Sequence, residues 1–204
     1  SNTQANNIFG GGNAAAVNGN TILNINTQST ISTSIYGGGN LGEILGKSIT
    51  TISDSTITEN IYGAGNKASV GLSETEDATD LTINNTTVKN IYGGGNAAQA
   101  NGNTNTTVSS TTVSESIFGG GNGTESTVEN DTTGEQNLAK VLGNANLIIN
   151  NGTTTKNIYG GGNLGMVNGN TNVSAISITG SASIYGGGNA AIVGKATYLL
   201  VSNC

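Results

Sequence analysis

A hexapeptide of the form Ile-(Tyr/Phe)-Gly-(Gly/Ala)-Gly-Asn occurs seven times in the 204 residues of the chain. The copies begin at Ile8, Ile35, Ile61, Ile91, Ile117, Ile158 and Ile184. The intervals between them are 27, 26, 30, 26, 41 and 26 residues, so the period is 26 and two intervals carry insertions. Self-similarity at a period of about 20 to 50 residues is typical of repeat architectures, so this repeat constrains the fold more than any other feature.

The rest of each period consists of strand-sized pieces rich in Ile, Val and Thr, separated by Gly and Asn, such as residues 22–25 and 48–52. No window shows a sustained helical period. One coil of 26 residues cannot bury its own apolar face, but stacked coils can, about 4.8 Å apart and with equivalent side chains in columns. A β-propeller needs blades of about 40 residues.

The chain is therefore predicted to be all-β, a single-stranded parallel β-helix (β-solenoid) of about seven coils of about 26 residues, with right-handed winding favoured. We expect a single domain over residues 1–204, with loop insertions near 71–80 and 123–141. Charge offers a test of register, because Glu59, Lys89, Glu115 and Lys156 each stand two residues before a motif Ile. Coils stacked in register would place these opposite charges next to one another.

The aromatic residues of the motif would form a column along the stack. Strand alternation suggests that Ile points inward, the ring outward and the first Gly inward. The opposite arrangement, with the rings in the core over the glycines, stays open. With rings outward, the column is a candidate binding surface made of Phe9, Tyr36, Tyr62, Tyr92, Phe118, Tyr159 and Tyr185.

The glycines of the motif would serve either positive φ or a corner too crowded for a Cβ atom. Ala64 takes the middle position once, which places the strict requirement at the first and third positions, such as Gly63 and Gly65. The closing Asn of the motif predicts a structural amide ladder, in which each side chain donates to the next. The ladder would contain Asn13, Asn40, Asn66, Asn96, Asn122, Asn163 and Asn189.

Eight of the twelve acidic residues lie in the two insertions. They are Glu74, Glu76, Asp77, Asp80, Glu125, Glu129, Asp131 and Glu135. Coils two apart are separated by about 10 Å, so both insertions would project from one side as an acidic patch. The patch is interpreted as solvated loops or, alternatively, as a weak site for Ca²⁺ or a cationic partner.

Composition excludes several classes of function. The chain has no His and no Arg, so it lacks an imidazole base, a histidine metal ligand and a bidentate phosphate-binding fork. A net charge of −6 speaks against nucleic acid and anionic membranes as partners. No apolar run is long enough to insert into a bilayer, and the single Cys204 has no partner for an internal disulfide. We therefore expect no enzyme activity and no cofactor.

Arrays of IYGGGN-like repeats with interleaved Gly-Asn-Thr turns and Thr-rich strands resemble the repetitive β-solenoid regions of bacterial cell-surface and adhesin-like proteins. The resemblance covers essentially the whole chain. It implies a structural or adhesive module, extracellular or on the cell surface, with a glycan or a host or cell-surface protein as partner, or with end-to-end self-association. Two alternatives are a carbohydrate-active β-helix enzyme of the pectate-lyase type and a Thr-rich ice-binding solenoid.

Overall fold

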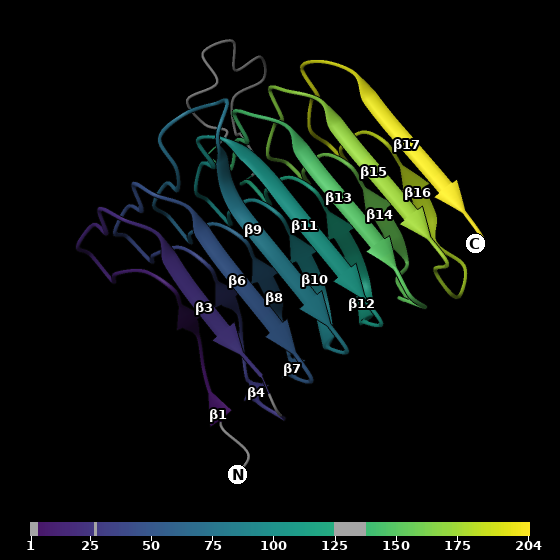
Figure 1. The fold of residues 1–204 in the computed structure, drawn as a ribbon, viewed down its shortest axis with the longest axis horizontal. Coiled ribbons are helices and arrows are strands. Elements are labelled where there is room, and N and C mark those ends of the chain that lie inside the picture. The colour runs from purple at the N-terminus through teal and green to yellow at the C-terminus, as the bar shows by residue number, and fades with distance from the viewer. Residues whose placement is uncertain (1–3, 27, 125–137) are drawn as a thin grey trace.

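The computed structural model describes residues 4–26, 28–124 and 138–204, which form seventeen β-strands and no helix. Figure 1 shows the coils stacked side by side from the N-terminus to the C-terminus. All strand pairings are parallel, and most strands pair with the equivalent strand of the next coil, about one repeat along the chain. The predicted all-β parallel solenoid of about seven coils is thus confirmed.

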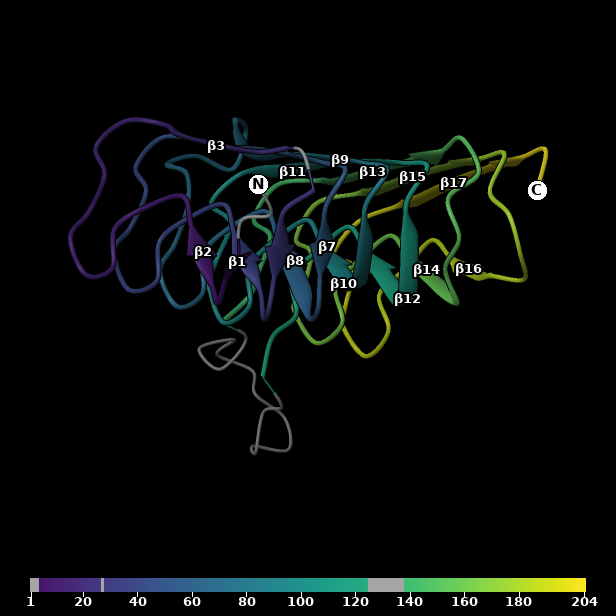
Figure 2. The same ribbon diagram turned by 90° about the horizontal axis from the view of Figure 1, so that it is seen from below.

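Two sheets run the length of the stack, one of seven strands and one of ten. Figure 2 shows the seven-stranded sheet nearly edge-on above the ten-stranded sheet. The seven-stranded sheet contains β3 (Thr21–Ile25), β6 (Ser48–Ser53), β9 (Asp77–Asn84), β11 (Asn103–Ser109), β13 (Ala145–Asn150), β15 (Thr171–Ile176) and β17 (Thr197–Ser202). The ten-stranded sheet contains β1 (Gln4–Ala5), β2 (Ile8–Phe9), β4 (Thr30–Ile31), β5 (Ile35–Tyr36), β7 (Thr56–Ile57), β8 (Asn60–Tyr62), β10 (Thr87–Tyr92), β12 (Thr112–Phe118), β14 (Asn157–Tyr159) and β16 (Ser183–Tyr185).

Columns of equivalent apolar side chains fill the interior of the stack. The motif isoleucines of the inner coils are fully buried, and they pack against Ile, Leu and Val side chains that alternate inward from the seven-stranded sheet, such as Ile52 and Leu147. A third side of the coil is closed by single-residue parallel bridges, which link Val17, Ile44, Val70, Ala100, Val141, Val167 and Val193. Burial of these columns requires neighbouring coils, which explains why the motif must repeat.

At the first motif glycine, the ladder of backbone hydrogen bonds between neighbouring coils skips one carbonyl, and the space there fits only glycine. The amide nitrogen of Gly93 donates to the Phe118 carbonyl and that of Gly94 to the Gly120 carbonyl, so the ladder skips the carbonyl of Gly119. That carbonyl accepts a hydrogen bond from the buried Thr104 hydroxyl across the interior, at 2.8 Å. A Cβ atom on Gly93 would collide with the same Gly119 oxygen.

This threonine clip recurs along the stack. Equivalent bonds run from the hydroxyls of Thr21, Thr79 and Thr171 to the carbonyls of Gly37, Gly93 and Gly186. The clip joins the seven-stranded sheet to the motif of the next coil. No local sequence pattern reveals it, because donor and acceptor are 14 to 16 residues apart. Thr residues therefore serve the interior as well as the solvated face.

Crowding, and not positive φ, explains the motif glycines, because every positive-φ glycine of the described residues lies outside the hexapeptide. At the third position, a Cβ atom on Gly65 would meet the Ala68 carbonyl oxygen. Positive φ occurs instead at the corner that follows each strand of the seven-stranded sheet. Apart from glycine, Asn and Asp tolerate this left-handed conformation best. They are four of the seven corner residues, which are Gln28, Asp54, Asn85, Ser110, Asn151, Ser177 and Asn203.

The structure also explains the single alanine at the middle motif position. At Gly38, a Cβ atom would lie 2.7 Å from Val70 of the next coil. At Ala64, the next coil carries Ala100, the only alanine in a column that otherwise holds Val or Ile. Both alanines are fully buried in one apolar cluster, so a smaller residue in one column compensates for a larger one in the other.

Candidate functional site

The seven motif rings stack face to face along the molecule. Neighbouring centroids lie 4.8 to 4.9 Å apart, and the ring planes differ by at most 9°. The rings form an apolar cluster of their own, separate from the isoleucine core, which agrees with alternation of Ile and ring across the strand. The expectation of solvent-facing rings is nevertheless wrong for Tyr36, Tyr62, Tyr92 and Phe118, each at most 9% exposed, because each ring covers the faces of its neighbours.

Burial changes the acidity of these phenols. Burial raises the pKa of Tyr92 to about 12, with a contribution from the Glu115 charge. Burial raises the pKa of Tyr62 as well, although Asn60 donates a hydrogen bond to its hydroxyl. Burial also raises the pKa of Tyr36. Among the rings, Tyr185 in the last coil is the most exposed at 48%. Tyr185 therefore offers the most exposed ring surface for sugar stacking, whereas Phe9 and Tyr159 are half-buried.

The predicted amide ladder of the motif asparagines is present. Six consecutive bonds of 2.8 to 3.0 Å run from Nδ2 of one asparagine to Oδ1 of the asparagine in the preceding coil. The backbone amides of the same residues donate to motif glycine carbonyls, for example from Asn66 to Gly39. All bonds of the ladder point the same way, so the stack has a polarity.

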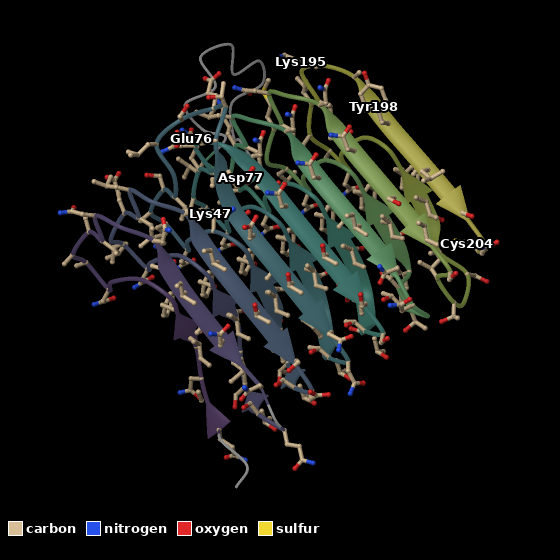
Figure 3. The ribbon with its side chains drawn as sticks, in the orientation of Figure 1. Lys47, Glu76, Asp77, Lys195, Tyr198 and Cys204 are labelled. Carbon is tan, nitrogen blue, oxygen red and sulfur yellow. The ribbon has the colours of Figure 1, made fainter. Side chains whose placement is uncertain are left out.

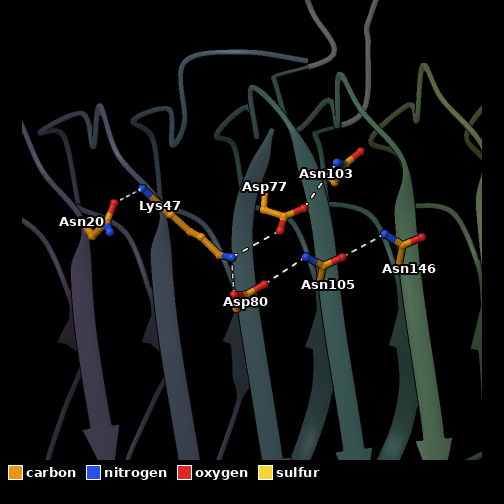
Figure 4. A network of polar contacts seen from close by, with 7 residues as sticks. All are labelled: Asn20, Lys47, Asp77, Asp80, Asn103, Asn105 and Asn146. Atoms are coloured by element: carbon orange, nitrogen blue, oxygen red, sulfur yellow. Dashed lines mark hydrogen bonds and ion pairs between the residues drawn. The ribbon is translucent and has the colours of Figure 1, made fainter. Parts of the chain in front are cut away.

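A second amide ladder crosses the outward face of the seven-stranded sheet, as Figure 4 shows. Asn146 donates to Asn105 at 2.8 Å, and Asn105 donates to Asp80 at 2.9 Å. Lys47 pairs with both Asp80 and Asp77, the latter at 3.3 Å, and its backbone amide donates to Asn20 at 2.8 Å. The network connects the first five coils along one edge of the sheet.

The acidic patch is only partly described. Asp77 to Asp80, the last four residues of the expected first insertion, belong to β9, and Figure 3 shows Lys47 beside Asp77. Glu74 and Glu76 precede the strand and are exposed. Glu125, Glu129, Asp131 and Glu135 lie outside the described residues, as does most of the insertion expected at 123–141, so the joint patch stays a prediction.

Lys47 and hydrogen bonds from asparagine side chains stabilise the two aspartates of β9. Burial opposes the ionisation of Asp77, but hydrogen bonds from asparagine side chains and from Lys47 hold the pKa of Asp77 below its ordinary value. Burial lowers the pKa of Lys47, but Asp80 and Asp77 outweigh it, and the pKa is raised. No group of three or more acids or cysteines in the described part of the chain is placed to hold a metal ion.

The charge pattern used to test register is met in part. Lys89 pairs with Glu59 at 3.4 Å, as in-register stacking requires. A register shift between β10 and β12 then separates Glu115 from Lys89. The Glu115 carboxylate instead accepts a hydrogen bond from the side-chain amide of Asn90, at 3.5 Å. Lys156 meets Glu115 through a backbone hydrogen bond of 3.1 Å.

A polar groove of about 800 Å³ follows the left-handed corner of the coils that contain β4, β7 and β10. Its lining residues carry hydroxyl, amide and carboxylate groups: Gln28, Ser29, Thr30, Asp54, Ser55, Thr56, Asn85 and Thr87. Asn85 donates to Asp54 at 2.6 Å, so neighbouring coils are linked within the groove. The groove presents hydrogen-bonding groups that repeat once per coil.

The threonines of this groove belong to a longer ladder. Parallel pairing places one threonine per coil in a single column: Thr30, Thr56, Thr87, Thr112, Thr154 and Thr179. Four of the six are exposed and the other two half-buried. This column is hidden in the sequence, because the two insertions and the corner lengths vary the spacing between its members.

Neither a protein-family model, nor a curated protein, nor a solved structure matches this chain. The described residues contain no helix long and apolar enough to cross a membrane.

Proposed function

We propose that the chain is a non-catalytic structural and adhesive module, extracellular or on a cell surface, that binds glycans through its polar corner groove. The observation that carries the proposal is the groove itself, where Thr30, Thr56 and Thr87 line up with Asp54 and Asn85 over three coils. Sugars are recognised by convergent donors and acceptors, and hydroxyl and amide groups supply both.

A regular stack favours a repetitive ligand. Equivalent groups in the groove recur at the spacing of neighbouring strands, about 4.8 Å, so an extended oligosaccharide along the axis would meet the same chemistry at each coil. The inner motif rings are buried against one another and offer no stacking platform there. Hydrogen bonds would therefore carry recognition.

The acidic residues support a non-catalytic role. A general acid in glycoside cleavage needs a raised pKa, whereas the pKa of Asp77 is lowered and its carboxylate is paired with Lys47. Asp80, the neighbouring acid, is also paired with Lys47. The described acids of β9 are thus held as structural ion-pair partners.

The test is a glycan array with the purified chain and a matched pair of variants. Thr56→Val lies inside the groove, whereas Thr179→Val changes the same ladder outside it. We expect wild type and Thr179→Val to bind one glycan class and Thr56→Val to lose most of that signal, with unchanged β-sheet circular dichroism. Equal binding by both variants, or an array without signal, would contradict the proposal.

The threonine ladder favours one second candidate, ice binding, because it places hydroxyl and methyl groups in register on six coils. Thermal hysteresis at millimolar protein, lost in Thr87→Leu, would support this function. A freezing point equal to the melting point would exclude it.

A further inference from the structure

One charged side chain lines the polar corner groove, and it is the carboxylate of Asp54. The other lining residues carry neutral hydroxyl and amide groups. The corner residues of the other coils are also neutral, so the charge does not repeat along the stack. Within the groove, Asp54 lies in the middle coil, bonded to the corner residues Gln28 and Asn85 of the two neighbouring coils. The groove is therefore neutral except for one negative charge in its middle coil.

This charge has no counterion in the described part of the chain. Lys89, which follows the groove residue Thr87 by two positions on β10, pairs instead with Glu59 at 3.4 Å. Lys47 precedes β6 and Asp54 follows it, so the length of the strand separates them, and Lys47 pairs with the aspartates of β9. The Asp54 carboxylate is thus available to a cation from outside the chain.

Hydrogen bonds hold Asp54 in place and leave one carboxylate oxygen open. Nδ2 of Asn85 donates to Oδ1 of Asp54 at 2.6 Å, and the backbone amide of Gln28 donates to the Asp54 carbonyl at 2.8 Å. Oδ2 has no partner among the residues that the structure describes, and Asp54 is exposed. A carboxylate that is already oriented loses little side-chain freedom when it binds a ligand.

The threonines of the groove supply neutral hydrogen-bonding groups beside this charge. The hydroxyls of Ser29 and Ser55 donate to backbone carbonyls, at 3.3 and 2.8 Å. The hydroxyls of Thr30, Thr56 and Thr87 make no hydrogen bond to a described residue, and Thr56 and Thr87 are exposed. A ligand along the groove would therefore meet one open hydroxyl in each of three coils and the carboxylate in the middle coil.

We propose that the groove selects oligosaccharides that carry free amino groups, and that Asp54 is the residue that determines this specificity. An ammonium group on the sugar donates a charge-assisted hydrogen bond to Oδ2 of Asp54. The same charge repels sugars that carry carboxylates, so it discriminates in both directions. The ring hydroxyls pair with the threonine hydroxyls in the flanking coils, which a lysine-rich peptide would leave unpaired. The inference rests on the proposed glycan-binding function and specifies its ligand class.

The test compares two oligosaccharides that differ only at nitrogen: a β-1,4-linked hexamer of glucosamine and the same hexamer with every amine acetylated. Acetylation removes the positive charges and keeps the remaining ring hydroxyls. Isothermal titration calorimetry with the full chain, at about pH 6 and low salt, measures the affinity for each. We expect the free amine form to bind at least about fivefold more tightly. High salt should remove this preference, because salt screens an exposed charge pair.

Two variants with the same change in net charge assign the effect to one residue. Asp54→Asn keeps the size of the side chain and removes its charge, so it should bind both hexamers as the parent binds the acetylated one. Glu43→Gln neutralises an exposed carboxylate that lies outside the groove and accepts a hydrogen bond from Ser69. This control should keep the preference of the parent. Circular dichroism of each variant shows that its fold is retained.

The outcomes separate this inference from the function on which it rests. Equal affinity of the parent for the two hexamers overturns the ligand class and leaves glycan binding intact. Binding of neither hexamer also overturns it, and the glycan array then decides separately whether the proposed function fails. Equal weakening by Asp54→Asn and Glu43→Gln overturns the role of Asp54, because net charge alone would explain the preference. Pentalysine that binds the parent as tightly as the glucosamine hexamer overturns the sugar ligand in favour of a cationic peptide.

Discussion

Two threonines on strand β11 should respond to the same substitution with opposite signs. Thr104 and Thr106 both point into the interior and are at most 1% exposed. The Thr104 hydroxyl donates to the Gly119 carbonyl at 2.8 Å, whereas the Thr106 hydroxyl has no hydrogen-bond partner among the residues that the structure describes. Valine replaces the hydroxyl by a methyl group of similar shape, so each substitution removes only the polar atom.

The magnitudes follow from the burial of the polar groups. Thr104→Val leaves the Gly119 carbonyl buried without its partner and should destabilise the chain by about 1 to 3 kcal/mol. Thr106→Val removes a buried hydroxyl that makes no hydrogen bond to a described residue, and it should stabilise the chain by about 1 kcal/mol. The site accepts the added volume, because the same column holds Leu81 and Leu147 in the neighbouring coils.

The assay is urea denaturation followed by far-ultraviolet circular dichroism. Repeat proteins can unfold in parts, but both positions lie in one coil, so they belong to the same cooperative unit and their midpoints are comparable. We expect a lower midpoint for Thr104→Val and a higher one for Thr106→Val, with equal slopes. A lower midpoint for both variants by the same amount would refute the distinction between a clipped and an unclipped threonine.

Three further predictions concern packing, ionisation and charge. Ala100→Val should lower the free energy of unfolding by about 1 to 3 kcal/mol through overpacking, and adding Ala64→Gly should recover most of the loss. Additive effects of the two substitutions in a double-mutant cycle, measured by denaturation, would contradict compensation. Burial raises the pKa of Tyr62 and of Tyr92, so folding stability should fall as pH rises from about 10 towards 12. A phenolate absorbance titration with all tyrosines ionising in one step near pH 10, in a folded chain, would argue against this. Lys47→Met should lower the free energy of unfolding by less than about 1 kcal/mol at low salt and by a smaller amount at high salt, as measured by thermal melts. A larger loss that does not depend on salt would contradict partly exposed ion pairs between Lys47 and the two aspartates.

Much of the fold could be read from the repeat. Period and residue type were enough to predict parallel coils, inward isoleucines and the amide ladder, because equivalent residues of neighbouring coils contact one another in an in-register stack. The same logic located Ala64 as an exception. It could not show that Ala100 compensates for it, since the two lie 36 residues apart and in different columns.

The candidate surfaces were harder to predict. Alternation placed the rings opposite the isoleucines, but it does not say whether an outward ring is covered, and at a separation of 4.9 Å each ring buries the next. The corner groove and the threonine ladder were missed because they join residues whose spacing varies with the insertions. Lys47 and Asp80 meet across 33 positions of sequence, and no local pattern connects them.

The amino-acid order determined everything that depends on one coil repeating the last: the strand period, the glycine corners, the asparagine column and the absence of imidazole and guanidinium chemistry. Exposure, groove shape, the threonine clips and the direction of the amide ladder were decided only when the coils stacked. The physical reason is that these properties belong to pairs and columns of residues, brought together by turns of unequal length, and a column exists only in three dimensions.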